Sequence, residues 1–272
     1  MKIENGIAVV TGAASGIGSA LAKELTRRGA RAIALVDRSE AVAATAAETR
    51  RAGDSPVLHF IGDVTDAAFR RKVFRDVAEQ YGPVSICVPA AGITKDSLSV
   101  RMNKETGEAE IYPLDTFRTV IEVDFVAPIY WALETVAGIA EARYKRGLKR
   151  WNAEQEDVQG VIVFIGSVSS QGNKGQIAYS ASKAGLEGAA ATLTKEATFY
   201  GIRCGVIHPG WTDTPMVRAL GEEFIRKNVL PSTQLGRLIR PEEIADAICF
   251  MITNSAVTGQ LWADAGWHAP AA

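Results

Sequence analysis

The chain alternates between short apolar runs and longer amphipathic stretches. The runs are rich in valine and isoleucine and have apolar residues on both faces, as is typical of strands in a parallel sheet covered by helices on both sides. They comprise Ile7–Val10, Ala32–Val36, Val57–Ile61, Val84–Val88, Val161–Ile165, Ile202–Ile207 and Gln260–Ala263. The stretches between the first four runs are expected to be helices at Gly16–Gly29, Ser39–Ala52 and Ala67–Tyr81, with apolar spacing and a Gly82-Pro83 stop signal as evidence.

A strand–helix–strand alternation of this kind produces right-handed βαβ units. The sequence therefore predicts an α/β fold, a single Rossmann-type doubly wound parallel sheet of about seven strands with helices on both faces. Residues 1–272 are expected to form one domain with insertions near 101–113 and 141–159. The first insertion has a polar, glycine-containing turn that predicts a small hairpin. The second is basic and then acidic, and it is interpreted as a solvated face, with a subunit contact as the alternative.

Composition narrows the class of protein. The 272 residues are 47% hydrophobic with a net charge of −1, so we expect neither a disordered chain nor a nucleic-acid-binding protein. No run reaches about 18 consecutive apolar residues, and the N-terminus lacks a signal-peptide pattern, so no membrane association is expected. Three distant cysteines lie in apolar runs. They indicate buried reduced thiols, no metal site and a cytoplasmic protein.

The first expected strand leads into a glycine-rich turn that opens a helix. Residues 11–18 read TGAASGIG. Glycines permit a tight turn and let a pyrophosphate approach the backbone, while the helix N-terminus offers unpaired N–H groups. This strand–turn–helix context predicts a phosphate-binding turn for a dinucleotide.

The second strand ends in Asp37, about 20 residues beyond the glycines. A carboxylate there accepts hydrogen bonds from ribose hydroxyls and repels a 2′-phosphate, which favours NAD over NADP. The adjacent Arg38 is the argument for NADP, since a guanidinium can hold a 2′-phosphate. Asp63, with Val64 after it, is a candidate for the adenine amino group, and a helix cap is the alternative role.

Tyr179 and Lys183 lie on one face of an expected helix that runs to about Tyr200. A nearby ammonium stabilises phenolate and so lowers the pKa of a tyrosine, which otherwise titrates near 10. A tyrosine tuned in this way can exchange a proton with an alcohol or carbonyl oxygen. Ser167, at the end of the preceding strand, is placed to hydrogen-bond the same oxygen.

The order of these motifs resembles the short-chain dehydrogenase/reductase family in its form of roughly 250 residues. The resemblance extends from Ile7 to Gly266. Besides the TGxxxGIG turn and the YxxxK pair, its marks are Asp63, Ala90-Ala91-Gly92, Ser167, Pro209-Gly210, Thr214, Arg240–Ala245 and Asp264–Gly266.

The resemblance implies Tyr179 as the acid/base, Ser167 as hydrogen-bond donor to the substrate oxygen, and Lys183 as the residue that contacts the nicotinamide ribose and tunes Tyr179. Together with the residues singled out above, it gives an expected cofactor site. This site comprises Gly12, Ser15, Gly16, Ile17, Gly18, Asp37, Arg38, Asp63, Val64, Ala90, Ala91, Gly92, Tyr179, Lys183, Pro209, Gly210, Thr212 and Thr214.

Four positions depart from the family pattern. Asp124 stands where the family usually has a proton-relay asparagine. An ionised Asp124 would favour the charged form of Lys183, so we expect retained activity with altered pH dependence. Ala90 and Ala91 replace a pair of asparagines that is common in the family, and His208 replaces an asparagine or a small residue. A structural role is expected for His208.

The substrate side is expected to lie in the most variable segments, 94–98, 171–177 and the loop after Thr214. The candidate substrate residues are Thr94, Ser169, Gln171, Trp211 and Met216. The mixture of apolar and polar side chains leaves a sugar or polyol, a hydroxyacyl thioester and a cyclic alcohol open. The family resemblance further implies a homotetramer, with a homodimer as the alternative, and Trp262 and Trp267 are candidates for a subunit interface.

We therefore expect an oxidoreductase that transfers a hydride between NAD(H) and a secondary alcohol or ketone. An NADPH-dependent 3-oxoacyl thioester reductase of the same fold is the first alternative. A non-catalytic dinucleotide-sensing protein is a remote one, because it would not need Ser167, Tyr179 and Lys183 together.

Overall fold

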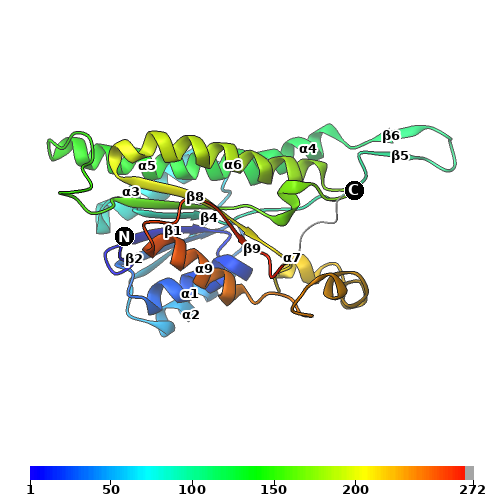
Figure 1. Cartoon of the computed structure of the whole chain (residues 1–272), viewed down its shortest axis with the longest axis horizontal. Helices are drawn as coiled ribbons and strands as arrows, with labels where there is room; N and C mark the ends of the chain where they lie inside the picture. The colour runs from blue at the N-terminus through cyan, green and yellow to red at the C-terminus, as the bar shows by residue number, and fades with distance from the viewer. Residues whose placement is uncertain (267–272) are drawn as a thin grey trace.

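Seven parallel strands form the central sheet of the computed structural model, which describes residues 1–266 (Figure 1). The order across the sheet is β3-β2-β1-β4-β7-β8-β9, as in a doubly wound fold that starts at the centre and moves first to one edge and then to the other. The strands are β1 (Ile7–Thr11), β2 (Ala32–Asp37), β3 (Val57–Ile61), β4 (Ile86–Pro89), β7 (Gly160–Ile165), β8 (Ile202–Pro209) and β9 (Gly259–Ala263). The predicted fold class is confirmed.

Helices cover both faces of the sheet (Figure 1). One face carries α1 (Gly16–Arg27), α2 (Val42–Ala52) and α9 (Pro241–Thr253), and the other carries α3 (Ala67–Tyr81), α5 (Ala127–Lys145) and α6 (Ile177–Ala197). Each layer encloses its own apolar core, because alternate side chains of the strands point to opposite faces. The central strands are buried along their length, which explains why they read as continuous apolar runs.

A single long helix crosses one side of the sheet. It consists of α4 (Leu114–Ile121), a π-helical turn η1 (Glu122–Val126) and α5, and it runs without a break from Leu114 to Lys145. By length and hydropathy this helix passes the test for a membrane span, but 39% of its most apolar window is buried inside the protein. Core helices of soluble proteins pass the same test.

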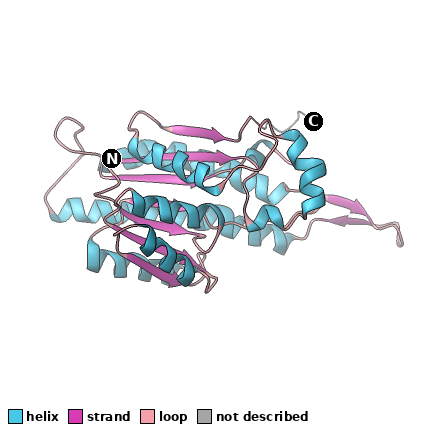
Figure 2. Ribbon diagram, turned by 90° about the horizontal axis from the view of Figure 1, so that it is seen from below, coloured by secondary structure: helices cyan, strands magenta, loops and turns pink. Residues whose placement is uncertain are grey.

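The first expected insertion forms the predicted hairpin. Strands β5 (Val100–Met102) and β6 (Ala109–Ile111) pair antiparallel and extend away from the central sheet (Figure 2). The second expected insertion begins inside α5 and continues as a loop. An ion pair between Arg143 on α5 and Glu156 in the loop holds the two together. Short helical segments complete the chain at η2 (Val168–Gln171), η3 (Thr198–Tyr200), α7 (Pro215–Arg218), α8 (Glu222–Phe224), η4 (Ile225–Val229) and η5 (Leu230–Ser232). Trp267 lies outside the described residues.

Candidate active site

The candidate residues gather where the parallel strands end. In an open α/β sheet, the crevice outside the carboxyl ends of the strands is the usual ligand site. The glycine-rich turn follows β1, Asp37 ends β2, and residues 89–92 follow β4. Ser167 follows β7 and Pro209 ends β8, so segments far apart in the sequence meet at one edge.

The turn between β1 and α1 has no room for a side chain at Gly12 or at Gly18. Gly12 and Gly16 have φ angles of +65° and +54°, which favour glycine. A Cβ on Gly12 would lie 2.7 Å from the Ala91 nitrogen, and one on Gly18 would lie 2.4 Å from the Gly12 oxygen. Helix α1 can therefore begin directly against β1, with its free N–H groups facing the crevice. This cradle fits the pyrophosphate of a dinucleotide.

Asp37 is held against the glycine-rich turn. Its Oδ2 accepts a hydrogen bond from the Ala14 N–H at 3.0 Å, and its Oδ1 accepts one from Ser39 N–H at 3.0 Å. A cavity of about 120 Å³ lies beside it. The cavity is lined by Gly12, Asp37, Arg38, Gly62, Asp63, Val64, Ala91, Gly92, Ile93 and Val123, which include seven of the expected cofactor residues.

Asp63 and Val64 form the loop after β3. Asp63 Oδ1 accepts hydrogen bonds from the N–H and hydroxyl of Thr65, and Asp66, three residues later, caps α3. The alternative role of helix cap therefore belongs to Asp66. Val64 is fixed by its carbonyl, which accepts a hydrogen bond from the buried Trp131 indole at 3.0 Å.

Tyr179, Ser167 and Lys183 come together around one point. Tyr179 lies in the first turn of α6, and both Tyr179 and Ser167 line the same pocket, close enough for the Ser167 side chain to lower the pKa of the phenol. The Lys183 ammonium lies 5.4 Å from the centre of the Tyr179 ring and donates a hydrogen bond to the Ile165 carbonyl at 3.1 Å. The four-residue spacing on α6 and the end of β7 thus bring a phenol, a hydroxyl and an ammonium into one site.

The pKa of Tyr179 is raised above its ordinary value, because the phenol is buried and its charged form is poorly solvated. The Lys183 ammonium lowers this pKa, as the sequence predicts, and the Ser167 side chain lowers it too. Burial, assisted by the carboxylate of Asp124, outweighs them. The predicted effect of Lys183 on the Tyr179 pKa is therefore present. The net shift has the opposite sign, because burial and Asp124 raise the pKa by more than Lys183 and Ser167 lower it.

Asp124 is fully buried in the π-helical turn η1, directly behind Lys183. Its Oδ1 accepts a hydrogen bond from Ile93 N–H at 2.9 Å, and its Oδ2 lies 3.6 Å from the Lys183 ammonium. Burial raises the pKa of Asp124, while Lys183 and the Ile93 N–H lower it. The aspartate that departs from the family pattern is thus the direct ionic partner of Lys183.

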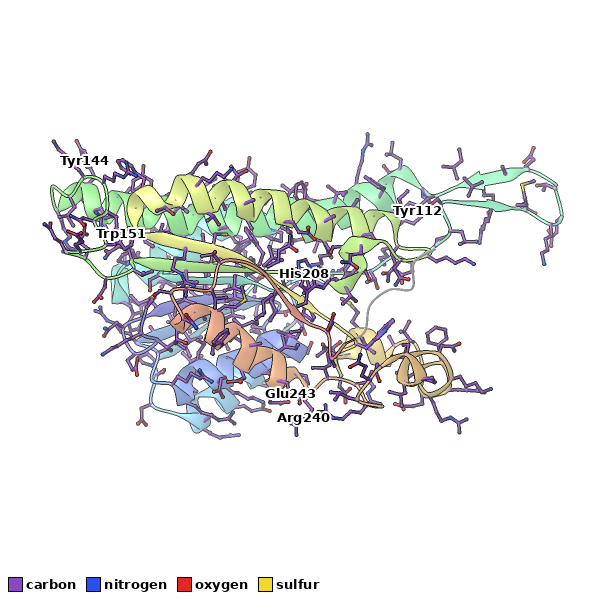
Figure 3. The ribbon with its side chains drawn as sticks, in the orientation of Figure 1. Tyr112, Tyr144, Trp151, His208, Arg240 and Glu243 are labelled. Atoms are coloured by element: carbon purple, nitrogen blue, oxygen red, sulfur yellow. The ribbon has the colours of Figure 1, made fainter. Side chains whose placement is uncertain are left out.

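His208 lies at the end of β8, in the interior of the protein (Figure 3). Its Nδ1 is 3.3 Å from the Ser167 nitrogen and 3.1 Å from the Ser167 oxygen, and its ring stacks on Trp262 at 4.2 Å. The side chain is completely buried, and burial lowers its pKa. These contacts fit the structural role expected for His208.

A pocket of about 320 Å³ opens in front of the Tyr179 hydroxyl. Thr94, Ser169, Trp211 and Met216 line it, as expected of substrate residues, whereas Gln171 is exposed and does not. The expected cofactor residues Ile17, Tyr179, Pro209, Gly210, Thr212 and Thr214 line the same pocket.

Other expected cofactor residues lie outside both cavities. Ser15 and Gly16 begin helix α1, Gly18 packs against Gly12, and Ala90 borders Gly12. Lys183 is buried behind the pocket, at 4% exposure. Ser15, Gly16 and Gly18 belong to the glycine-rich turn itself, and Ala90 and Lys183 lie directly beside the two cavities.

Sequence reasoning missed one wall of the pocket. Phe224, Asn228 and Val229 lie in the short helices that follow α7, and together with Val217 they line the pocket that Tyr179 also lines. Their segments, at most five residues long, show no usable hydrophobic period. In the sequence, the apolar residues that follow Thr214 are the one sign of this pocket wall.

The comparisons with known proteins agree with this geometry. The short chain dehydrogenase family model matches residues 6–224. The chain is 33% identical over 263 residues to the 3-oxoacyl-(acyl-carrier-protein) reductase FabG of Escherichia coli, covering 96% of both chains. It is 31% identical over 247 residues to the acetoacetyl-CoA reductase of Allochromatium vinosum, covering 90% of both. A short-chain type dehydrogenase/reductase from Mycobacterium marinum has the same fold, with a TM-score of 0.82 over 99% of both chains at 22% identity.

Proposed function

This chain belongs to the short-chain dehydrogenase family, and on that premise we propose that it is an NAD(H)-dependent oxidoreductase that reduces the keto group of a 3-oxoacyl thioester. The arrangement of Tyr179, Ser167 and Lys183 around one point carries the proposal. Secondary alcohols and ketones in general were the first expectation from the sequence. The names of the two curated relatives described above favour the thioester alternative within that class.

The residues present fit a nicotinamide dinucleotide. The glycine-rich turn would hold the pyrophosphate, the cavity at Asp37 and Asp63 would hold the adenosine, and Pro209, Gly210 and Thr214 would border the nicotinamide. When bound, the nicotinamide supplies or accepts the hydride. The preference for NAD(H) is supported by Asp37, whose carboxylate would repel a 2′-phosphate and already takes the backbone donors of Ala14 and Ser39.

Tyr179 would donate the proton that the reduced substrate oxygen requires. A raised pKa keeps the phenol protonated at neutral pH, which suits a general acid for carbonyl reduction. Ser167 would donate a hydrogen bond to the same oxygen as negative charge develops on it. Lys183, anchored by the Ile165 carbonyl and Asp124, would stabilise the phenolate that remains.

The experiment is to titrate NADH and NADPH separately with acetoacetyl-CoA and to follow the loss of the reduced cofactor. We expect turnover with NADH at a kcat/KM at least about tenfold above that with NADPH, a difference of roughly 1.4 kcal/mol. A preference for NADPH would reverse the role given to Asp37. Turnover of simple alcohols or sugars with NAD⁺, and none of the thioester, would reject the substrate class.

We propose further that the enzyme works in the cytoplasm as a homotetramer. The three cysteines are free and buried, as suits a reducing compartment. Helices α5 and α6 leave apolar side chains such as Tyr130, Leu133 and Ile177 exposed, and these offer a surface for subunit contact.

A further inference from the structure

A second cleft lies at the base of the β5–β6 hairpin. It has a volume of about 530 Å³, within the range of sites that take small molecules. Its wall is formed by the hairpin, the loop after β4 and the start of α4. The lining residues are Thr94, Lys95, Asp96, Ser97, Leu98, Arg101, Glu110, Ile111, Tyr112, Pro113 and Thr116.

This cleft adjoins the catalytic pocket. Thr94 and Asp96 line both, so the two spaces meet across the loop after β4. The same loop is fastened to the segment that leads into α6. Ser97 N–H donates to the Gly175 carbonyl at 2.9 Å, and the Gln176 amide donates to Asp96 Oδ2 at 2.8 Å.

The hairpin is held beside the loop by Tyr112 at its base (Figure 3). The Tyr112 hydroxyl donates to the Lys95 carbonyl at 2.6 Å, and the Tyr112 N–H donates to the Ser99 carbonyl at 2.9 Å. The hairpin, the loop after β4 and the segment that leads into α6 are thereby joined by hydrogen bonds. An occupant of the outer cleft would lie next to the loop that also borders the Tyr179 pocket.

The lining indicates a neutral, flexible occupant. Its charges balance, with Lys95 and Arg101 against Asp96 and Glu110, and Arg101 Nε donates to Glu110 Oε2 at 2.5 Å. Exposed apolar side chains, including Ile111 at 77% exposure, lie among these polar groups. Such a surface suits a chain that alternates methylene groups with amides and hydroxyls, and it does not suit a strongly anionic ligand.

We infer that the outer cleft is a subsite for the amide-bearing pantetheine arm of the thioester substrate. The inference rests on the function proposed above, because that arm carries the acyl group in both thioester classes named for the relatives. The keto group would react at Tyr179 while the arm leaves the catalytic pocket past Thr94 and Asp96. Binding of this non-reacting part would then contribute to the rate.

The test compares two thioesters of the same acyl group. Acetoacetyl-CoA carries the whole arm and a nucleotide beyond it, and acetoacetyl-N-acetylcysteamine carries only the thiol end of the arm. The wild-type enzyme should favour the CoA ester by at least about tenfold in kcat/KM, since the short ester lacks most of the arm. Thr116→Trp fills the cleft from α4. This change should lower kcat/KM for the CoA ester by about tenfold, chiefly through KM, and should change that for the short ester by less than about twofold.

Thr119→Trp is the matched control, because Thr119 lies on the same helix and does not line the cleft. It should leave both substrates unaffected, and the retained turnover of the short ester reports that each variant is folded. Equal kcat/KM for the two esters in the wild type, or an equal loss of both in Thr116→Trp, would overturn the subsite while leaving the proposed function intact. If neither ester is reduced and a simple ketone is, the proposed function is wrong and the subsite with it.

Discussion

Tyr179 illustrates how one residue takes its chemistry from its surroundings. Its side chain is half-buried in the pocket beside Ser167, and the ammonium of Lys183 lies 5.4 Å from the centre of its ring. Burial favours the protonated phenol. The Lys183 ammonium lowers the free energy of the phenolate that forms when the proton leaves. A group in this balance can donate a proton without an external acid.

Removing the phenol should stop the reaction and leave cofactor binding intact. For Tyr179→Phe we expect kcat to fall by about 10²–10⁴-fold, the usual contribution of a general acid, with NADH affinity nearly unchanged. Stopped-flow or steady-state rates and NADH fluorescence titration would measure the two quantities. Tyr144→Phe is the control, because Tyr144 is 84% exposed on α5, and it should behave as wild type. A wild-type rate in Tyr179→Phe would refute the mechanism.

Asp124 should set the pH at which the enzyme works. Its carboxylate raises the pKa of Tyr179. Reduction needs the phenol protonated, so the rate falls as the pH rises through that pKa. Asp124→Asn removes the negative charge and lowers the Tyr179 pKa, so the fall should move to lower pH with activity retained. The rise in the reverse, oxidative rate should move in the same direction.

The pH profile of kcat/KM in both directions would measure this shift. Glu122→Gln is the control, since Glu122 is an exposed acid in the same π-helical turn. An unchanged profile in Asp124→Asn would mean that the aspartate acts through its backbone or its Ile93 hydrogen bond alone, and the electrostatic role would be wrong.

At the scale of elements, the turn between β1 and α1 depends on close backbone approach. Gly18→Ala would place a methyl group 2.4 Å from the Gly12 oxygen. The turn must then open, which should cost about 1–3 kcal/mol of stability and weaken dinucleotide binding. Denaturant unfolding and NADH titration would detect the two effects.

Gly188→Ala is the matched substitution. Gly188 lies within α6 and has nothing within 4 Å of its added Cβ, so the change should stabilise the protein by up to about 1 kcal/mol. If Gly18→Ala were equally harmless, the glycine-rich turn would not need the close approach described above.

The elements differ in how clearly the sequence predicts them. The strand Val57–Ile61 and the helix Ala67–Tyr81 have the expected bounds. The ends of the helix are predictable because Asp66 caps its start and Gly82 follows its last residue. The π-helical turn at Glu122–Val126 was not predicted. It interrupts a continuous helix by one widened turn, and apolar spacing does not report such a change. Its consequence is the position of Asp124 behind Lys183.

At the scale of the whole molecule, the exposed side of the helical layer should be a subunit interface. Tyr130, Leu133 and Ile177 are 38–49% exposed on α5 and α6, and burial of apolar surface favours association. We expect light scattering at micromolar concentration to report four chains, or two if only one interface forms. A monomer would contradict the assembly, and Leu133→Glu should weaken it.

The sequence by itself determined the fold class, and it predicted the glycine-rich turn and the candidate catalytic trio of Ser167, Tyr179 and Lys183. Alternation of buried strands with amphipathic helices is a local property, and so is the four-residue spacing that puts Tyr179 and Lys183 on one helix face. The end of each strand also marks which residues meet at the carboxyl edge of the sheet.

Only the tertiary structure decided the electrostatics and the limits of the site. The net rise in the Tyr179 pKa comes from burial and from Asp124, which belongs to another helix. The wall made by Phe224, Asn228 and Val229, and the outer cleft beneath the hairpin, arise where separate segments meet. Local patterns report the environment of neighbours along the chain, whereas desolvation and pocket shape depend on distances through space, which packing alone sets.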